Sequence, residues 1–161
     1  ITLLNIDLKI ITKALAIRLS AVLPSLIHPN QACVPGRHID NNIHIVQNLI
    51  DLINETDGEL AIIFLDQEKA FDRMSHSFII KTLEHFGFGN NFINWIKTIC
   101  NQTKSFVKVN GYETEEFDIE RGVRQGCPLS CFLYVLTVET LSSHIRKNKR
   151  INGFRYMMKN L

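Results

Sequence analysis

The sequence reads Leu60-Ala61-Ile62-Ile63-Phe64-Leu65-Asp66 at the point where its hydrophobic pattern changes. This apolar run comes one residue after the turn signal Asp57-Gly58, and it ends abruptly at a carboxylate. A short continuous apolar run is typical of a strand that is buried on both faces. We therefore predict a buried strand over 60–65, with Asp66 at its end.

Helical periodicity flanks this run on both sides, because apolar residues recur every three or four positions. Helices are predicted over 5–27, 39–55, 75–86, 90–101 and 129–145. Asn110-Gly111 is a strong turn signal and predicts a hairpin over 104–120. Pro128 is expected in the first turn of the last helix, and another strand is predicted to begin within 151–156. Helices interleaved with a buried strand and a hairpin indicate an α+β fold.

Composition sets broad limits. A chain of 161 residues suits one domain or a large piece of one, and 18 Lys and Arg against 16 Asp and Glu favour no particular partner. The four cysteines form no C-x-x-C pair, so a structural zinc site is not expected. No apolar run reaches membrane-spanning length, and we expect no membrane partner. The chain begins at Ile1 without a signal peptide, and we expect the natural N-terminus to lie upstream.

Asp66 is the first candidate for chemistry, because a carboxylate at a strand end is held by rigid backbone. Mg²⁺ binds few, well-placed carboxylate oxygens and is completed by phosphate oxygens. The alternative is that Asp66 only caps the turn that follows. Phe71 closes that turn, and by base rates it is a core aromatic.

A second candidate is the glycine- and arginine-rich segment that ends in Gly126-Cys127-Pro128. Gly126 lets a ligand approach the backbone closely, and the helix after Pro128 offers unpaired N–H groups that favour an anion. Arg124 and Gln125 add hydrogen-bond donors. The alternative is a plain loop-to-helix junction with a solvated arginine.

Together these segments resemble the reverse transcriptases of LINE-type retrotransposons. Residues 64–73 are similar to that family's D-x-x-K-A-F-D motif, and 122–130 to its R-Q-G-C-P-L-S motif. Residues 3–19 look like its first fingers segment, 31–37 like its second, and the hairpin falls where the family has one. The resemblance covers nearly the whole chain, in the same order and at the same separation. It fits LINE-type elements better than group II intron or retron enzymes.

The resemblance implies a right-hand polymerase fold, with helices of the fingers over 1–59 and part of the palm over 60–161. Asp66 would be one of three aspartates that bind two Mg²⁺ ions. Phe71 would lie under the sugar of the incoming nucleotide and exclude a 2′-hydroxyl, and Gln125 and Gly126 would position nucleotide and template. Further contacts with template, primer or phosphate are expected at Lys9, Arg37 and Arg124. The implied reaction adds deoxynucleotides to a DNA primer on an RNA template, and the resemblance implies an intracellular protein of the cytoplasm and nucleus.

The sequence departs from the family pattern in ways that affect activity. The family's Ala-Asp-Asp motif, which holds the other two aspartates, is absent, and so is an arginine expected just before Ile1. We therefore expect the 161 residues to be inactive alone and poorly soluble, with an exposed strand edge. The alternative function is a decayed or domesticated copy that only binds nucleic acid.

Overall fold

The computed structural model describes residues 4–56, 59–101, 103–151 and 153. Its helices are α1 (Ile6–Leu26), α2 (Ile39–Thr56), α3 (His76–His85), α4 (Asn90–Cys100) and α5 (Ser130–Lys147). Its strands are β1 (Lys104–Ser105), β2 (Lys108–Val109), β3 (Tyr112–Glu113) and β4 (Phe117–Asp118). The predicted helices and hairpin are confirmed, each helix ending within two residues of its predicted bounds. The mixture of helices and small sheets is that of an α+β protein.

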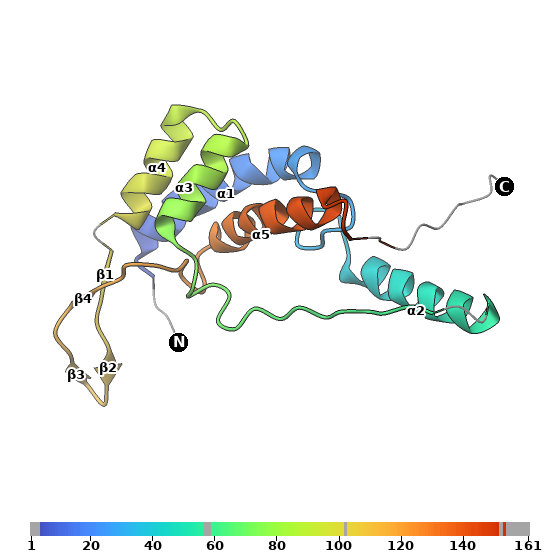
Figure 1. Ribbon diagram of the computed structural model, residues 1–161. Helices are drawn as coiled ribbons and strands as arrows, with labels where there is room; N and C mark the ends of the chain where they lie inside the picture. Colours follow the sequence, from blue (N-terminus) through green and yellow to red (C-terminus); the bar gives the residue numbers. More distant parts are fainter. Residues whose placement is uncertain (1–3, 57–58, 102, 152, 154–161) are drawn as a thin grey trace.

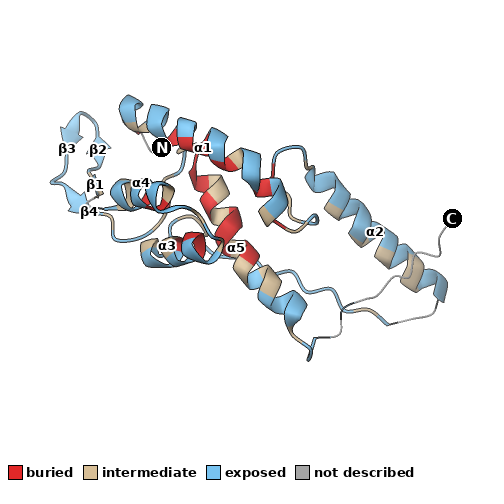
Figure 2. Cartoon of the chain, turned by 90° about the horizontal axis from the view of Figure 1, so that it is seen from above, coloured by how far each residue is buried: buried red, intermediate tan, exposed pale blue. Residues whose placement is uncertain are grey.

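The core lies between four helices, with α5 packed against both α1 and α3, and α3 packed against α4 (Figure 1). The buried residues, red in Figure 2, lie where these helices face one another. On α1 they follow the predicted spacing of four residues, at Leu15, Leu19 and Leu23. The largest fully buried apolar side chains are Leu19, Leu23, Ile79, Leu83, Ile96, Leu129 and Leu136.

The hairpin projects away from these helices (Figure 1). Strand β2 pairs with β3 in antiparallel register, Val109 opposite Tyr112. Asn110 and Gly111 both have positive φ, 52° and 86°, as the tight turn favoured in two-residue hairpins requires. Nearer the helices, β1 pairs with β4, which ties the base of the hairpin together.

The predicted buried strand over 60–65 is wrong. This segment has no strand pairing, and Ile63, Phe64 and Leu65 are 79%, 82% and 77% exposed. A strand needs a neighbour to accept and donate its main-chain hydrogen bonds, and no described strand lies beside it. The apolar pattern indicated what the segment could bury, and no described residue covers Ile63, Phe64 or Leu65.

Helix α2 likewise forms from an apolar pattern whose residues are not buried. It forms where predicted, yet no side chain on it is buried, and it packs against no other described helix. It lies apart from the helical core, joined to α3 by the long extended segment (Figure 1). The strand predicted within 151–156 falls mostly outside the described residues.

Candidate active site

Asp66 lies in an exposed segment immediately before a tight turn. The turn is closed by the N–H groups of Asp72 and Arg73, which both donate to the carbonyl of Lys69 at 2.9 and 3.0 Å. Lys69 takes a positive φ of 50°, and Arg73 pairs with Glu68 at 2.6 Å. No ion pair involves Asp66 within the described residues, so its carboxylate oxygens are open to a ligand.

The two candidate segments meet through their main chains. The N–H of Gly122 donates to the carbonyl of Met74 at 2.6 Å, and the N–H of Val123 donates to that of Phe71 at 2.8 Å. His76 adds a side-chain contact, its Nε2 lying 2.9 Å from the carbonyl oxygen of Gly122 and donating to it. The turn that carries Phe71 is therefore held against the segment that leads to Gln125 and Gly126.

Gly122 makes this contact possible. Its φ is +96°, and a Cβ added there would lie 3.0 Å from the carbonyl oxygen of Asp72 and 3.2 Å from that of Phe71. A side chain would force the two segments apart. Sequence reasoning singled out Gly126 and missed Gly122, because the contact joins residues far apart in the chain.

Gln125 and Gly126 form an exposed turn, with Gly126 at a φ of +81°. Its base is fixed by the carbonyl of Arg124, which accepts from Ser130 Oγ at 2.8 Å and from the N–H of Cys127 at 3.2 Å. The Arg124 guanidinium donates to the carbonyl of Lys104 at 3.1 Å, which links the turn to the hairpin.

The prediction that Pro128 lies in the first turn of the last helix is wrong, because α5 begins two residues later, at Ser130. The N–H of Ser130 donates to the carbonyl of Cys127 at 3.1 Å. A short turn over 127–130 thus precedes the helix and places Pro128 outside it.

Tyr134 is a residue that sequence reasoning missed. From the second turn of α5 its ring packs against Phe71, with centroids 5.1 Å apart and planes tilted by 35°. Its hydroxyl donates to Gln67 Oε1 at 3.2 Å, beside Asp66. One side chain therefore touches both ends of the D-x-x-K-A-F-D segment.

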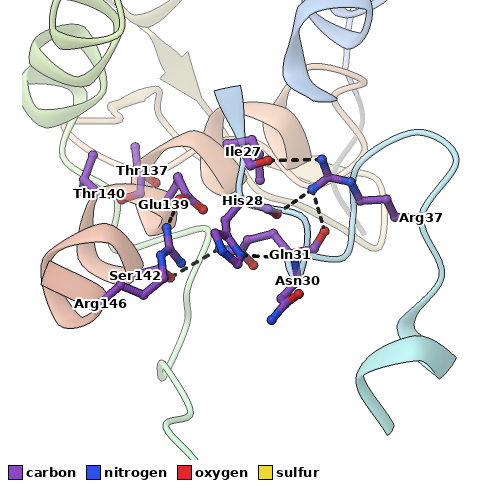
Figure 3. A network of polar contacts seen from close by, with 10 residues as sticks. All are labelled: Ile27, His28, Asn30, Gln31, Arg37, Thr137, Glu139, Thr140, Ser142 and Arg146. Carbon is purple, nitrogen blue, oxygen red and sulfur yellow. Dashed lines mark hydrogen bonds and ion pairs between the residues drawn. The ribbon is translucent and has the colours of Figure 1, made fainter. Parts of the chain in front are cut away.

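Arg37 lies in a different place. Its guanidinium donates to four carbonyls at the end of α1 and in the following loop, those of Pro24, Ile27, His28 and Gln31. Figure 3 shows three of these bonds, and beside them Gln31 reaching Ser142 on α5. Ser142 lies eight residues beyond Tyr134, or roughly 12 Å along the helix. The structure thus separates Arg37 from the site around Asp66.

Lys9 is on the exposed side of α1, beside Ile6, Ile10 and Lys13. No contact in the described residues ties it to Asp66. Its expected role at template or phosphate remains a prediction, as does that of Arg37.

The described residues contain no group of three His, Cys, Asp or Glu side chains that could hold a metal ion. Burial raises the pKa of the Cys100 thiol to about 11, with Cys127 nearby as a smaller cause. Cys100 is therefore a neutral thiol at physiological pH. The role of Asp66 as a metal ligand remains a prediction.

Comparison with known proteins identifies the class. The family model for reverse transcriptases (RNA-dependent DNA polymerases) matches residues 1–157. The chain therefore belongs to the reverse transcriptase family. Among its described residues, no helix combines the length and apolar character needed to cross a membrane.

The relatives narrow the class to retrotransposons without long terminal repeats, as the LINE-type motifs indicated. The chain is 43% identical over 154 residues to the transposon TX1 uncharacterized 149 kDa protein of Xenopus laevis, covering 95% of this chain and 12% of that protein. It is 29% identical over 157 residues to a retrovirus-related Pol polyprotein from the type-1 retrotransposable element R2 of Popillia japonica, covering 95% of this chain and 22% of that protein. A similar protein of Drosophila melanogaster, from element R2DM, is 36% identical over 77 residues, 48% of this chain and 7% of that protein. The chain thus spans a small part of each relative's length.

Proposed function

We propose that the protein to which this chain belongs is an RNA-directed DNA polymerase, and that the chain supplies its fingers (1–59) and part of its palm (60–161). The pairing of Gly122 and Val123 with Met74 and Phe71 carries this proposal. Through it, two motifs that the sequence separates lie against each other, as a shared nucleotide site requires. The substrates would be an RNA template, a DNA primer and deoxynucleoside triphosphates.

Each site residue has a role that fits its placement. Asp66 carries an exposed carboxylate without a competing ion pair among the described residues, which suits a ligand of Mg²⁺. Phe71, at the end of the same turn, would face the sugar of the incoming nucleotide. Gln125 and Gly126, on their exposed turn, would position the nucleotide and template. Arg124 and Lys9 would contact phosphates.

The residues present fit one part of a metal site. Two Mg²⁺ ions, when bound, would stabilise the charge on the attacking and leaving oxygens. One carboxylate is too few to hold two ions, because each Mg²⁺ ion in such sites is bound by one or two carboxylates together with substrate phosphates. The 161 residues alone should therefore extend no primer, and the remaining ligands would come from the rest of the protein.

The test is primer extension on an RNA template by the full-length protein that contains this chain. Replacing Asp66→Asn keeps the size of the side chain and removes its charge, and we expect synthesis to fall to background. Asp118→Asn is the matched control, since Asp118 is exposed on β4 and lies outside the site.

Two outcomes would contradict the proposal. Undiminished DNA synthesis by the Asp66→Asn protein would remove Asp66 from the chemistry. A wild-type full-length protein that binds RNA and extends no primer would favour a role in nucleic-acid binding only.

A further inference from the structure

We infer that Tyr134 is a positioning residue for Phe71 and thereby contributes to the choice between deoxyribonucleotides and ribonucleotides. The inference rests on the proposed function, in which the Phe71 ring excludes a 2′-hydroxyl. It concerns what holds that ring in place. Exclusion of one hydroxyl by a ring requires the ring to stay within a fraction of an ångström of its position.

The main chain of Phe71 is fixed, while its side chain needs support. The Phe71 carbonyl accepts from the N–H of Val123 at 2.8 Å, which anchors the backbone. The ring is only half-buried, so one part of it faces solvent. Rotation about its side-chain bonds would move the ring edge by several ångströms unless a neighbour opposes it.

Tyr134 is that neighbour. Its ring packs on Phe71 at a centroid distance of 5.1 Å and a tilt of 35°, within the range in which aromatic pairs attract. The contact joins two segments that lie far apart in the chain.

The Tyr134 ring is itself well held. It belongs to α5, where the adjacent residues Leu133, Val135 and Leu136 are buried in the core. Its hydroxyl donates to Gln67 Oε1 at 3.2 Å, which fixes the outer end of the ring. The core thus holds α5 in place, α5 holds the Tyr134 ring, and the Tyr134 ring holds that of Phe71.

The experiment measures the ratio of ribonucleotide to deoxyribonucleotide incorporation by the full-length protein on an RNA template. Tyr134→Leu removes the ring and should raise this ratio by about two- to tenfold, the range that corresponds to loss of one aromatic pair. Tyr134→Phe keeps the ring and removes only the hydroxyl, so its ratio should rise less than that of Tyr134→Leu. Tyr134→Met replaces Tyr134→Leu if the leucine protein does not fold.

Phe132→Leu is the matched control, because Phe132 is a half-buried aromatic on the same helix that packs against the core. It should leave the ratio unchanged. A wild-type ratio in both Tyr134→Leu and Tyr134→Met would overturn the inference, as would an equal rise in Tyr134→Phe and Tyr134→Leu.

Phe71→Ala separates this inference from the function on which it rests. A raised ratio in Phe71→Ala, with no change in Tyr134→Leu, would refute the role of Tyr134 alone. An unchanged ratio in Phe71→Ala would refute the role proposed for Phe71, and the role of Tyr134 with it.

Discussion

Because Gly122 has no side chain, two segments of main chain can meet at this residue. The glycine brings the turn with Phe71 against the segment that leads to Gln125, and His76 donates to its carbonyl. Neither Gly122 nor Tyr134 could be found from the sequence pattern, because each acts through a contact with a residue about fifty or more positions away. Asp66 and Gly126 could be proposed from the chemistry of their short segments, and Phe71 from the resemblance of its motif to that of LINE-type reverse transcriptases.

Replacing Gly122→Ala should destabilise the chain by roughly 1–3 kcal/mol, because the new Cβ would meet the backbone of Asp72 at a φ that side chains rarely adopt. Urea unfolding followed by circular dichroism would measure the loss. Gly87→Ala is the matched control, since Gly87 shares a positive φ, +75°, and has no atom within 4 Å of an added Cβ. Equal stability of the two variants would show that the close approach at Gly122 is unimportant.

At the scale of elements, the helices and the hairpin could be predicted because their signals are local. The spacing of Leu15, Leu19 and Leu23 repeats within one helix, and Asn110-Gly111 specifies its own turn. The contacts that stabilise the end of a helix are less local. The last turn of helix α1, which contains Pro24, and the loop after it present carbonyls to Arg37, which lies ten or more residues away in two cases.

Replacing Arg37→Lys should destabilise the chain by about 1.5–3 kcal/mol, because an ammonium group cannot reproduce a planar fork that serves four carbonyls. Chemical unfolding would measure the loss, and limited proteolysis should cut the loop after α1 sooner. Arg18→Lys, an exposed position on α1, is the control and should be neutral.

A second variant, Arg37→Gln, removes the positive charge and bears on the expected contact of Arg37 with nucleic acid. If Arg37 only stabilises the loop, the salt dependence of RNA binding by the full-length protein will match the wild type. A shallower slope in Arg37→Gln would instead indicate a lost phosphate contact.

At the scale of the whole molecule, the sequence pattern identified the apolar segments but not the residues that would pack against them. Burial of a strand depends on neighbours that its own residues do not encode. The described chain therefore has a helical core built as predicted, beside an extended segment whose side chains Ile63, Phe64 and Leu65 face solvent. Helix α2 lacks buried side chains for the same reason.

Exposed apolar residues on an unpaired extended segment favour association between copies. Replacing Phe64→Lys should therefore raise the fraction of monomer at a given concentration of the isolated chain, as sedimentation velocity would measure. Leu141→Lys introduces the same charge at an exposed position on α5 and should have less effect. A wild-type chain that stays monomeric at high concentration would contradict this expectation.

The contacts of Gly122 and His76 also bear on how such proteins diverge. His76 and Gly122 lie 46 positions apart, and the bond between them closes the intervening chain into a loop with fixed ends. Residues gained or lost at the Asn110-Gly111 tip would lengthen or shorten an outlying hairpin while its anchored base stays in place. Related retrotransposons should therefore tolerate insertions and deletions at the hairpin tip. They should tolerate few insertions or deletions between 66 and 75 or between 121 and 128.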